Sequence, residues 1–245
     1  MRDLLAAEYL KLRTTKTTWG LLVATVVTTA LAVVGAILVA SNSKLNLESL
    51  HGIREVLHVT AAGGIFVLVL GVIISAGEYR QRTATDTFLT TPQRWKVIVS
   101  KLVVATTSGV VFGALSAGTA IAVANHLYSA KGFTFPLGSS QAWTILGGAV
   151  LAAALFGALG AATGSLIRNQ VSAIVGWMAW LFVIENIVLG FSSTFGRWLP
   201  SALSRALVRD PNAQLLPQST AAIALVIYGV VIMLTAVLTE RRRDA

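Results

Sequence analysis

The run "WGLLVATVVTTALAVVGAILVA", residues Trp19–Ala40, decides the fold because it contains no charged side chain over its whole length. A helix needs about 20 consecutive apolar residues to cross a hydrocarbon core of about 30 Å, and this run supplies them. Five further runs of the same character follow along the chain: Val59–Ala76, Val97–Ala124, Ala142–Ile167, Val171–Gly190 and Ser219–Thr239. The sequence therefore predicts an all-α, polytopic membrane protein in which residues 1–245 form one domain with six transmembrane helices.

The composition agrees with a membrane protein and excludes several other classes. Hydrophobic residues make up 55% of the chain and charged residues only 12%, against roughly 25% charged residues in a soluble domain. The sequence lacks the alternating segments of about ten residues that build transmembrane barrels. It also lacks cysteine, which excludes disulfides and thiolate metal sites. The net charge of +9 favours contact with anionic membrane lipids over binding of nucleic acid.

The basic residues set the expected orientation. Six spans place both termini on the same side of the membrane. The segments on that side hold 13 basic residues and those on the other side hold 6, which together are the 19 of the chain. Because cytoplasmic segments carry the excess of lysine and arginine, both termini are expected in the cytoplasm.

Residues 1–18 precede the first span and are expected to form a helix in the cytoplasmic membrane interface. Apolar residues recur at helical spacing within "RDLLAAEYLKLR", while basic residues can face lipid headgroups. The residues assigned to this helix are Glu8, Tyr9, Lys11, Leu12 and Arg13. The alternative is a charged lead-in to the first span.

Two segments on the outer side have unusual patterns. The stretch 41–58 is weakly amphipathic and could extend the second span as a helix. Residues 191–218 are neither polar enough for a plain loop nor apolar enough to span, and prolines interrupt them at Pro200, Pro211 and Pro217. We expect an extracellular re-entrant hairpin there, since non-spanning backbone is tolerated at that depth when protein covers it. The alternative is a long surface loop.

Small residues concentrate in the third and fourth spans, where glycines lie three or four positions apart in "GVVFG" and "GALGAATG". Such spacing lets helix backbones approach closely within lipid. It predicts a seam, either within one helical bundle or between two copies, although glycine is also common in membrane helices generally.

No standard catalytic motif is present in the sequence. The chain has no "GxxxxGK[ST]", no "HExxH" and no "GxSxG", so we expect no catalytic residue, no metal site and no bound cofactor. One ionisable residue lies inside a span, namely Glu185, followed by Asn186. Because a charge at membrane depth is costly, this pair is a candidate for the translocation path. The alternative is that Glu185 lies near the outer headgroups or forms hydrogen bonds within the bundle.

The polar segment 77–96, in "GEYRQRTATDTFLTTPQRWKVIVSKL", interrupts two apolar runs. Threonines and Asp86 can cap a short helix over "TATDTFL", and Pro92 would stop it. A rigid polar element held between two spans is suited to receive force from another protein. The alternative is an interfacial loop that contacts only lipid and water.

The chain resembles, over its full length, the permease subunits of ABC-2 type ATP-binding-cassette exporters, and most closely the small six-span permeases of actinobacterial drug and antibiotic efflux systems. Two stretches carry this resemblance. The first matches the family's interfacial start at Glu8, Lys11 and Leu12. The second matches its cytoplasmic coupling segment at Glu78, Thr83, Thr91, Pro92, Arg94 and Lys101. The family often has glycine where this chain has Arg82.

The resemblance implies a bacterial plasma-membrane permease that exports an amphiphilic small molecule, drug, antibiotic or lipid-like cargo. Energy would come from two copies of a separate nucleotide-binding subunit, which would hold ATP and Mg²⁺, and a second permease copy or homologue would complete the path. The path would be lined by spans one, two and five. The residues assigned to ATPase coupling are Glu78, Arg80, Arg82, Thr83, Asp86, Pro92 and Arg94. Glu78 has an alternative role, pairing with the interfacial helix.

Two other functions remain open from the sequence. One is an autonomous carrier or channel that uses Glu185 as a proton or cation site. The other is an immunity-type membrane protein that exports or sequesters a peptide.

Overall fold

The computed structural model describes residues 1–42, 49–81, 94–211 and 215–242. Within these ranges the chain forms helices and no strands. Six helices are long and apolar enough to cross a membrane: Lys16–Ser41, Leu50–Arg80, Trp95–Ala130, Ser140–Ile167, Gln170–Phe191 and Gln218–Thr239. The predicted all-α class and the six spans are confirmed.

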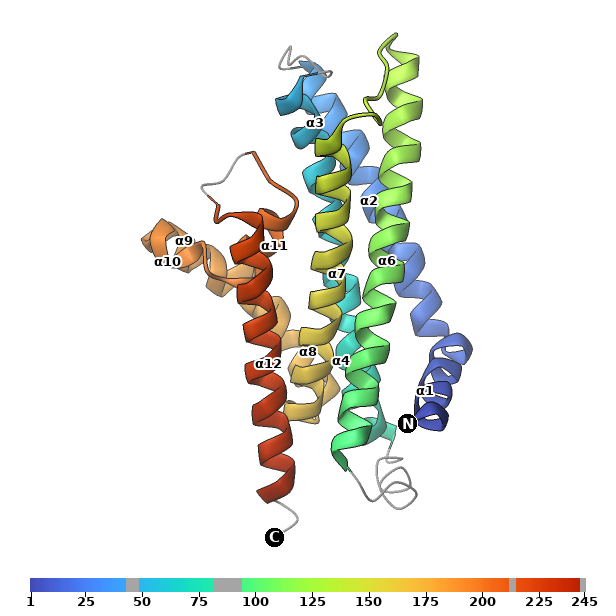
Figure 1. Ribbon diagram of the computed structural model, residues 1–245, viewed down its shortest axis with the longest axis vertical. Helices are drawn as coiled ribbons and strands as arrows, with labels where there is room; N and C mark the ends of the chain where they lie inside the picture. The colour runs from blue at the N-terminus through green and yellow to red at the C-terminus, as the bar shows by residue number, and fades with distance from the viewer. Residues whose placement is uncertain (43–48, 82–93, 212–214, 243–245) are drawn as a thin grey trace.

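The first helix, α1 (Arg2–Thr14), is followed by Thr15 in an extended conformation, after which α2 (Lys16–Asn42) forms the first span. The predicted helix over residues 1–18 thus ends at Thr14, because the chain turns at Thr15. Figure 1 shows α1 at the lower end of the molecule, beside the foot of α6 and inclined to α2. The end of α12 lies at the same end of the molecule, as an even number of spans requires.

The second span begins earlier than its apolar run. Helix α3 (Leu50–Leu57) is capped by the side chain of Ser49 and leads through a 3₁₀ turn (His58–Gly63) into α4 (Gly64–Gln81). The expected helical extension over the 41–58 stretch is confirmed from Leu50 onward. Hydropathy alone missed its start because α3 is amphipathic and buries only one face.

Helices α6 (Arg94–Ala130) and α7 (Ser140–Ile167) form the centre of the bundle together with α4. Figure 1 shows α7 between α4, α6 and α12. A Cβ atom on Gly109 of α6 would lie 2.5 Å from the carbonyl oxygen of Ala153, and one on Gly157 of α7 would lie 2.5 Å from that of Ala105. The predicted glycine seam is therefore found inside the bundle, where it joins α7 to its neighbours.

The fifth span is interrupted. Helix α8 (Gln170–Ala179) passes through one π-helical turn (Trp180–Ile184) into α9 (Glu185–Phe191). Figure 1 shows α9 and the short α10 (Ser193–Gly196) leaning away from the other helices. The fifth span has few buried residues, so lipid or another protein must cover most of its surface.

The 191–218 segment returns to the bundle through α11 (Pro200–Leu207), which buries most of its residues against α7 and α12 (Gln218–Arg242). The side chain of Gln218 donates hydrogen bonds to the carbonyl oxygens of Leu207, at 2.6 Å, and Thr144, at 3.3 Å. This amide therefore fixes α11 between the start of α12 and the start of α7.

Candidate functional site

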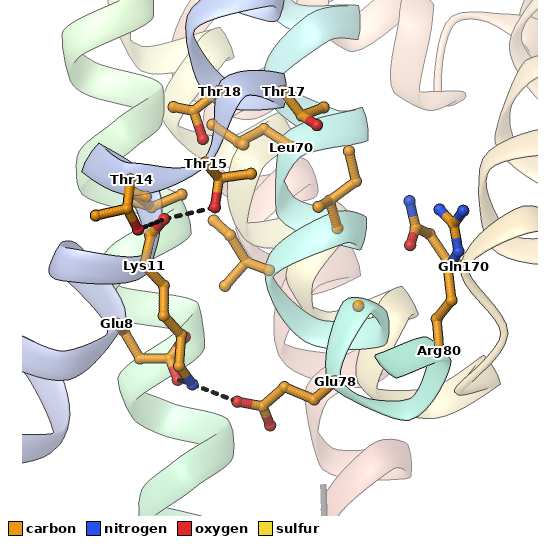
Figure 2. A pocket seen from close by; sticks show the side chains of 14 residues that line it. Glu8, Lys11, Thr14, Thr15, Thr17, Thr18, Leu70, Glu78, Arg80 and Gln170 are labelled. Carbon is orange, nitrogen blue, oxygen red and sulfur yellow. Dashed lines mark hydrogen bonds and ion pairs between the residues drawn. The ribbon is translucent and has the colours of Figure 1, made fainter. Parts of the chain in front are cut away.

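Four charged side chains from three helices meet at the lower end of the bundle. Glu8 and Lys11 come from α1, Glu78 comes from the last turn of α4, and Lys101 comes from the second turn of α6. We call these four residues the charge cluster. Figure 2 shows Lys11 reaching from α1 to the Glu78 carboxylate on α4.

The distances within the charge cluster are those of hydrogen-bonded ion pairs. Lys11 Nζ lies 2.5 Å from Glu78 Oε1 and 2.9 Å from Glu8 Oε1. Lys101 Nζ lies 3.0 Å from Glu78 Oε1 and 3.1 Å from Glu8 Oε1, and it also donates to the carbonyl oxygen of Ile74 at 3.1 Å. Each lysine therefore contacts both glutamates, and the two positive and two negative charges balance.

Three members of the charge cluster are buried. Glu8 is 4% exposed, Lys101 is 5% exposed and Glu78 is 8% exposed. A buried charge is tolerated only when it is paired and hydrogen-bonded, and removing one partner of such a pair typically costs about 3–5 kcal/mol. The charge cluster therefore holds α1 against α4 and α6 in one arrangement.

Lys11 lies at the edge of the charge cluster and is half exposed. Burial by itself lowers the pKa of its ammonium group, but the hydrogen bonds and charges of Glu78 and Glu8 outweigh that effect and raise the pKa above its ordinary value of 10.5. Lys11 consequently stays charged throughout the physiological range, which keeps the charge cluster neutral overall.

The rest of α1 adds apolar contacts and one hydrogen bond. Leu5 and Leu12 pack against a core cluster formed by residues of α4, α6 and α7. The Tyr9 hydroxyl lies 2.5 Å from the Thr107 hydroxyl of α6. The Trp19 indole nitrogen donates to the Arg13 carbonyl oxygen at 3.1 Å, which closes the turn between α1 and α2. Every residue assigned to the interfacial helix therefore either contacts a neighbouring helix or belongs to this turn.

A pocket of about 360 Å³ opens beside the charge cluster. It lies between α1, the start of α2, α4 and the start of α8, as Figure 2 shows. Its polar lining includes Lys11, Arg80 and Gln170, and its apolar lining includes Leu70 and Ile73. We call this space the interhelical pocket.

The residues assigned to ATPase coupling separate into two groups. Glu78 belongs to the charge cluster, where it takes the alternative role of pairing with α1, and Arg80 is an exposed residue of the interhelical pocket. Arg82, Thr83, Asp86 and Pro92, with the expected short helix over "TATDTFL", lie outside the described residues. Arg94 begins α6, and its side chain is likewise outside the described part.

Glu185 and Asn186, the candidates for the translocation path, belong to the fifth span, which contributes no residue to the charge cluster. Glu185 is completely buried, and one of its carboxylate oxygens accepts hydrogen bonds from the backbone N–H of Ser201, at 2.9 Å, and from the Ser201 hydroxyl. It therefore caps the first turn of α11, which realises the alternative of hydrogen bonding within the bundle. Asn186 is exposed and donates to the carbonyl oxygen of Phe182 at 2.9 Å.

Sequence reasoning identified each member of the charge cluster but did not predict that all four meet. It missed the pocket residues Thr14, Thr15, Thr17, Thr18 and Gln170, because single polar residues at the start of a span carry no distinctive signal. It also missed the stacking of Arg168 over the Tyr79 ring, 5.2 Å from its centroid. Among the described residues no group of three or more histidine, aspartate or glutamate side chains is arranged to hold a metal ion.

No family model matches the sequence, and no curated protein is significantly similar to it.

Proposed function

We propose that this chain is the transmembrane permease subunit of an ATP-driven exporter of the ABC-2 type. The observation that carries the proposal is the charge cluster. Its members come from the two stretches whose residues resemble that family, and contacts between them join sequence positions up to 93 residues apart. A polar segment that receives force would need such an anchor on the helices at both of its ends.

The anchoring is favourable for coupling because of where the cluster residues lie. Glu78 is the second residue of the polar segment 77–96, and Lys101 lies five positions after its last residue, in the second turn of α6. Glu78 binds Lys11 of α1, and Lys101 binds Glu8 of α1. A displacement of the segment between α4 and α6 would therefore move α1, and with it the entry of the first span.

In this proposal the chain supplies the path and another protein supplies the energy. Two nucleotide-binding subunits would hold ATP and Mg²⁺, and ATP would act by favouring one conformation of the helical bundle over the other. A second permease copy or homologue would cover the exposed helices. We further propose a bacterial plasma membrane, cytoplasmic termini, and an amphiphilic drug, antibiotic or lipid-like cargo.

The proposal is tested by reconstitution. The chain is purified with the nucleotide-binding subunit encoded beside it, and both are placed in liposomes with a fluorescent amphiphilic dye. We expect ATP-dependent dye movement with both proteins and none with the chain alone. Movement by the chain alone, driven by a pH gradient and lost in Glu185→Gln, would instead identify an ion-coupled carrier. ATP-independent protection of cells against a peptide would identify an immunity protein.

The coupling role of the polar segment has its own test. Charge reversal at Asp86 and at Arg94 should weaken association with the ATPase subunit and reduce transport. The matched control is charge reversal at Arg197, an exposed arginine in the 191–218 segment, which should leave both unchanged. If reversal at all three positions has the same effect, the segment does not dock the ATPase.

A further inference from the structure

The interhelical pocket lies where the ends of three spans meet. Helix α2 begins at Lys16, α4 ends at Gln81 and α8 begins at Gln170, and the pocket is lined from all three and from α1. Spans that cross the same membrane end near its surface. The polar rim of the pocket therefore lies at the level of lipid headgroups.

The pocket changes from polar to apolar along α4. Arg80 lies at one end and Leu70 at the other, with Ile73 and Ile74 also in the lining. Ten residues of helix span about 15 Å, which is about half of a hydrocarbon core of about 30 Å. The α4 wall of the pocket thus runs over about the depth of one membrane leaflet from a cationic to an apolar end, whereas the facing wall carries threonines, with Thr17 and Thr18 near Leu70.

The charge of the pocket is positive after its internal pairs are counted. The charge cluster contributes two positive and two negative charges, which cancel. Arg80 adds one positive charge, and it forms no ion pair or hydrogen bond with another described residue. Counted with Lys101, which pairs with both glutamates but does not itself line the pocket, the described charges around it sum to +1. A guanidinium at the rim that is unpaired among the described residues favours an anionic ligand.

Hydrogen-bond donors accompany this guanidinium. Figure 2 shows Arg80 and Gln170 on the side of the pocket opposite to Glu8 and Lys11. The Gln170 amide forms no hydrogen bond with other described residues, so it can donate to a ligand beside Arg80.

From these observations we infer that the interhelical pocket binds one anionic phospholipid, with its phosphate at Arg80 and Gln170 and an acyl chain along Leu70 and Ile73. Arginine offers a planar pair of N–H donors that matches the oxygens of a phosphate. The apolar side chains of the α4 wall would remove the acyl chain from water. Such a lipid would join α1, α4 and α8 at the membrane surface. The inference does not depend on transport, because it concerns only the resting protein and the surrounding bilayer.

Two other ligands resemble an anionic phospholipid in part. A free phosphate ion has the headgroup chemistry but no acyl chain, and a zwitterionic lipid has the acyl chains but no net charge. The experiment therefore compares three probes on the full-length protein in detergent: phosphatidylglycerol, phosphatidylcholine with the same acyl chains, and inorganic phosphate. Native mass spectrometry counts the bound lipid molecules and gives the affinity of the protein for the first one that binds. We expect the first phosphatidylglycerol to bind more tightly than the first phosphatidylcholine, and excess inorganic phosphate not to displace it.

Two variants test the position of the lipid. Arg80→Gln should lower the affinity for the first phosphatidylglycerol molecule about fivefold, the usual effect of one basic residue on the binding of anionic lipid. The affinity for phosphatidylcholine should not change. Gly77→Leu should remove the tightest site. A Cβ on Gly77 would meet only the Ile73 side chain, at 3.9 Å, so the new side chain fits the helix and fills the pocket.

The matched control is Arg197→Gln, an exposed arginine in the 191–218 segment, which should bind phosphatidylglycerol like the unaltered protein. Equal losses in Arg80→Gln and Arg197→Gln would show a general charge effect and overturn the inference. Unchanged binding in Gly77→Leu would also overturn it, and so would displacement of the lipid by inorganic phosphate.

Discussion

At the scale of single residues, Lys101 is the most constrained member of the charge cluster. It is 5% exposed and contacts both glutamates and the Ile74 carbonyl oxygen. In Lys101→Met the two carboxylates would share Lys11 alone, so we expect the free energy of unfolding to fall by about 3 kcal/mol. Thermal unfolding in detergent, followed by tryptophan fluorescence, measures this.

The control for this variant is Lys131→Met. The Lys131 side chain is exposed and, among the described residues, its ammonium group donates to the Ser41 hydroxyl alone, at 2.7 Å, so its loss should change the unfolding free energy by no more than about 0.5 kcal/mol. The double variant Glu78→Gln/Lys101→Met restores the charge balance and should recover part of the loss. If the double variant is less stable than Lys101→Met, charge pairing does not explain the site.

Glu185 makes a different kind of contact, because it caps another helix. We expect Glu185→Leu to speed hydrogen exchange in α11 by about tenfold, since the Ser201 backbone N–H and hydroxyl lose their acceptor. Glu185→Gln keeps an acceptor oxygen, so the amide hydrogens of α11 should exchange about as slowly as in the unaltered protein. Asn186→Leu is the control, because the Asn186 amide donates to carbonyl oxygens of the preceding π-helical turn and not to α11. Equal exchange in Glu185→Leu and Asn186→Leu would contradict the capping role.

At the scale of helices, α6 offers a matched pair of glycines. A Cβ on Gly109 would lie 2.5 Å from the Ala153 carbonyl oxygen, whereas one on Gly118 would meet nothing within 4 Å. Gly109→Ala must push α6 away from α7 and should cost about 1–3 kcal/mol. Gly118→Ala should be neutral or stabilise the helix by up to about 1 kcal/mol. The two variants are compared by their midpoints of thermal unfolding. Equal midpoints would contradict the close contact between α6 and α7 at Gly109.

The docking of α1 should depend on alkaline pH. Because the pKa of Lys11 is raised in the folded state, its ion pairs stabilise the docked helix fully below 10.5, the ordinary value, and this contribution is lost as the pH rises through the folded-state pKa. Spin labels on cysteines introduced at the exposed positions Leu10 and Val110 report the separation of α1 from α6. We expect the separation to increase above pH 10.5.

Lys11→Arg distinguishes this mechanism from general alkaline unfolding. Arginine stays protonated at high pH and can still pair with the glutamates. The separation of α1 should then begin at a higher pH than in the unaltered protein. The same midpoint in both proteins would mean that Lys11 does not control docking.

The helices themselves were largely predictable, and the contacts between them were not. Apolar runs marked all six spans because length and hydropathy are local properties. The π-helical turn at Trp180–Ile184 left no trace in "WLFVI", which contains neither proline nor glycine. Glu8 and Lys101 contact each other across 93 positions, a separation that helical periodicity does not address.

At the scale of the whole molecule, α6 is longer than the membrane is thick. The span Trp95–Ala130 has 36 residues, hence about 54 Å, against a hydrocarbon core of about 30 Å. An upright α6 would project beyond the hydrocarbon core on the side opposite to α1. That projection makes the orientation of the chain directly measurable.

The orientation is tested with single cysteines, for which the cysteine-free chain gives no background. Cysteines at the exposed positions Ser129 and Thr14 lie at opposite ends of the molecule. In intact spheroplasts, a membrane-impermeant maleimide should label Ser129→Cys at once and Thr14→Cys only after permeabilisation. Val110→Cys, on the lipid-facing middle of α6, should remain unlabelled throughout. The opposite order would place both termini outside.

The sequence separation within the charge cluster also governs how the protein is made. Glu8 and Lys11 leave the ribosome at the start of synthesis, Glu78 follows much later, and Lys101 comes 93 residues after Glu8. At about 5–20 residues per second this interval lasts about 5–20 s. Until Lys101 is inserted, two carboxylates share one ammonium group, so an incomplete chain carries an unbalanced charge at the membrane surface. Insertion of the first turns of the third span is therefore the step that fixes α1, and a nascent chain stalled before Lys101 lacks the partner that balances the two carboxylates.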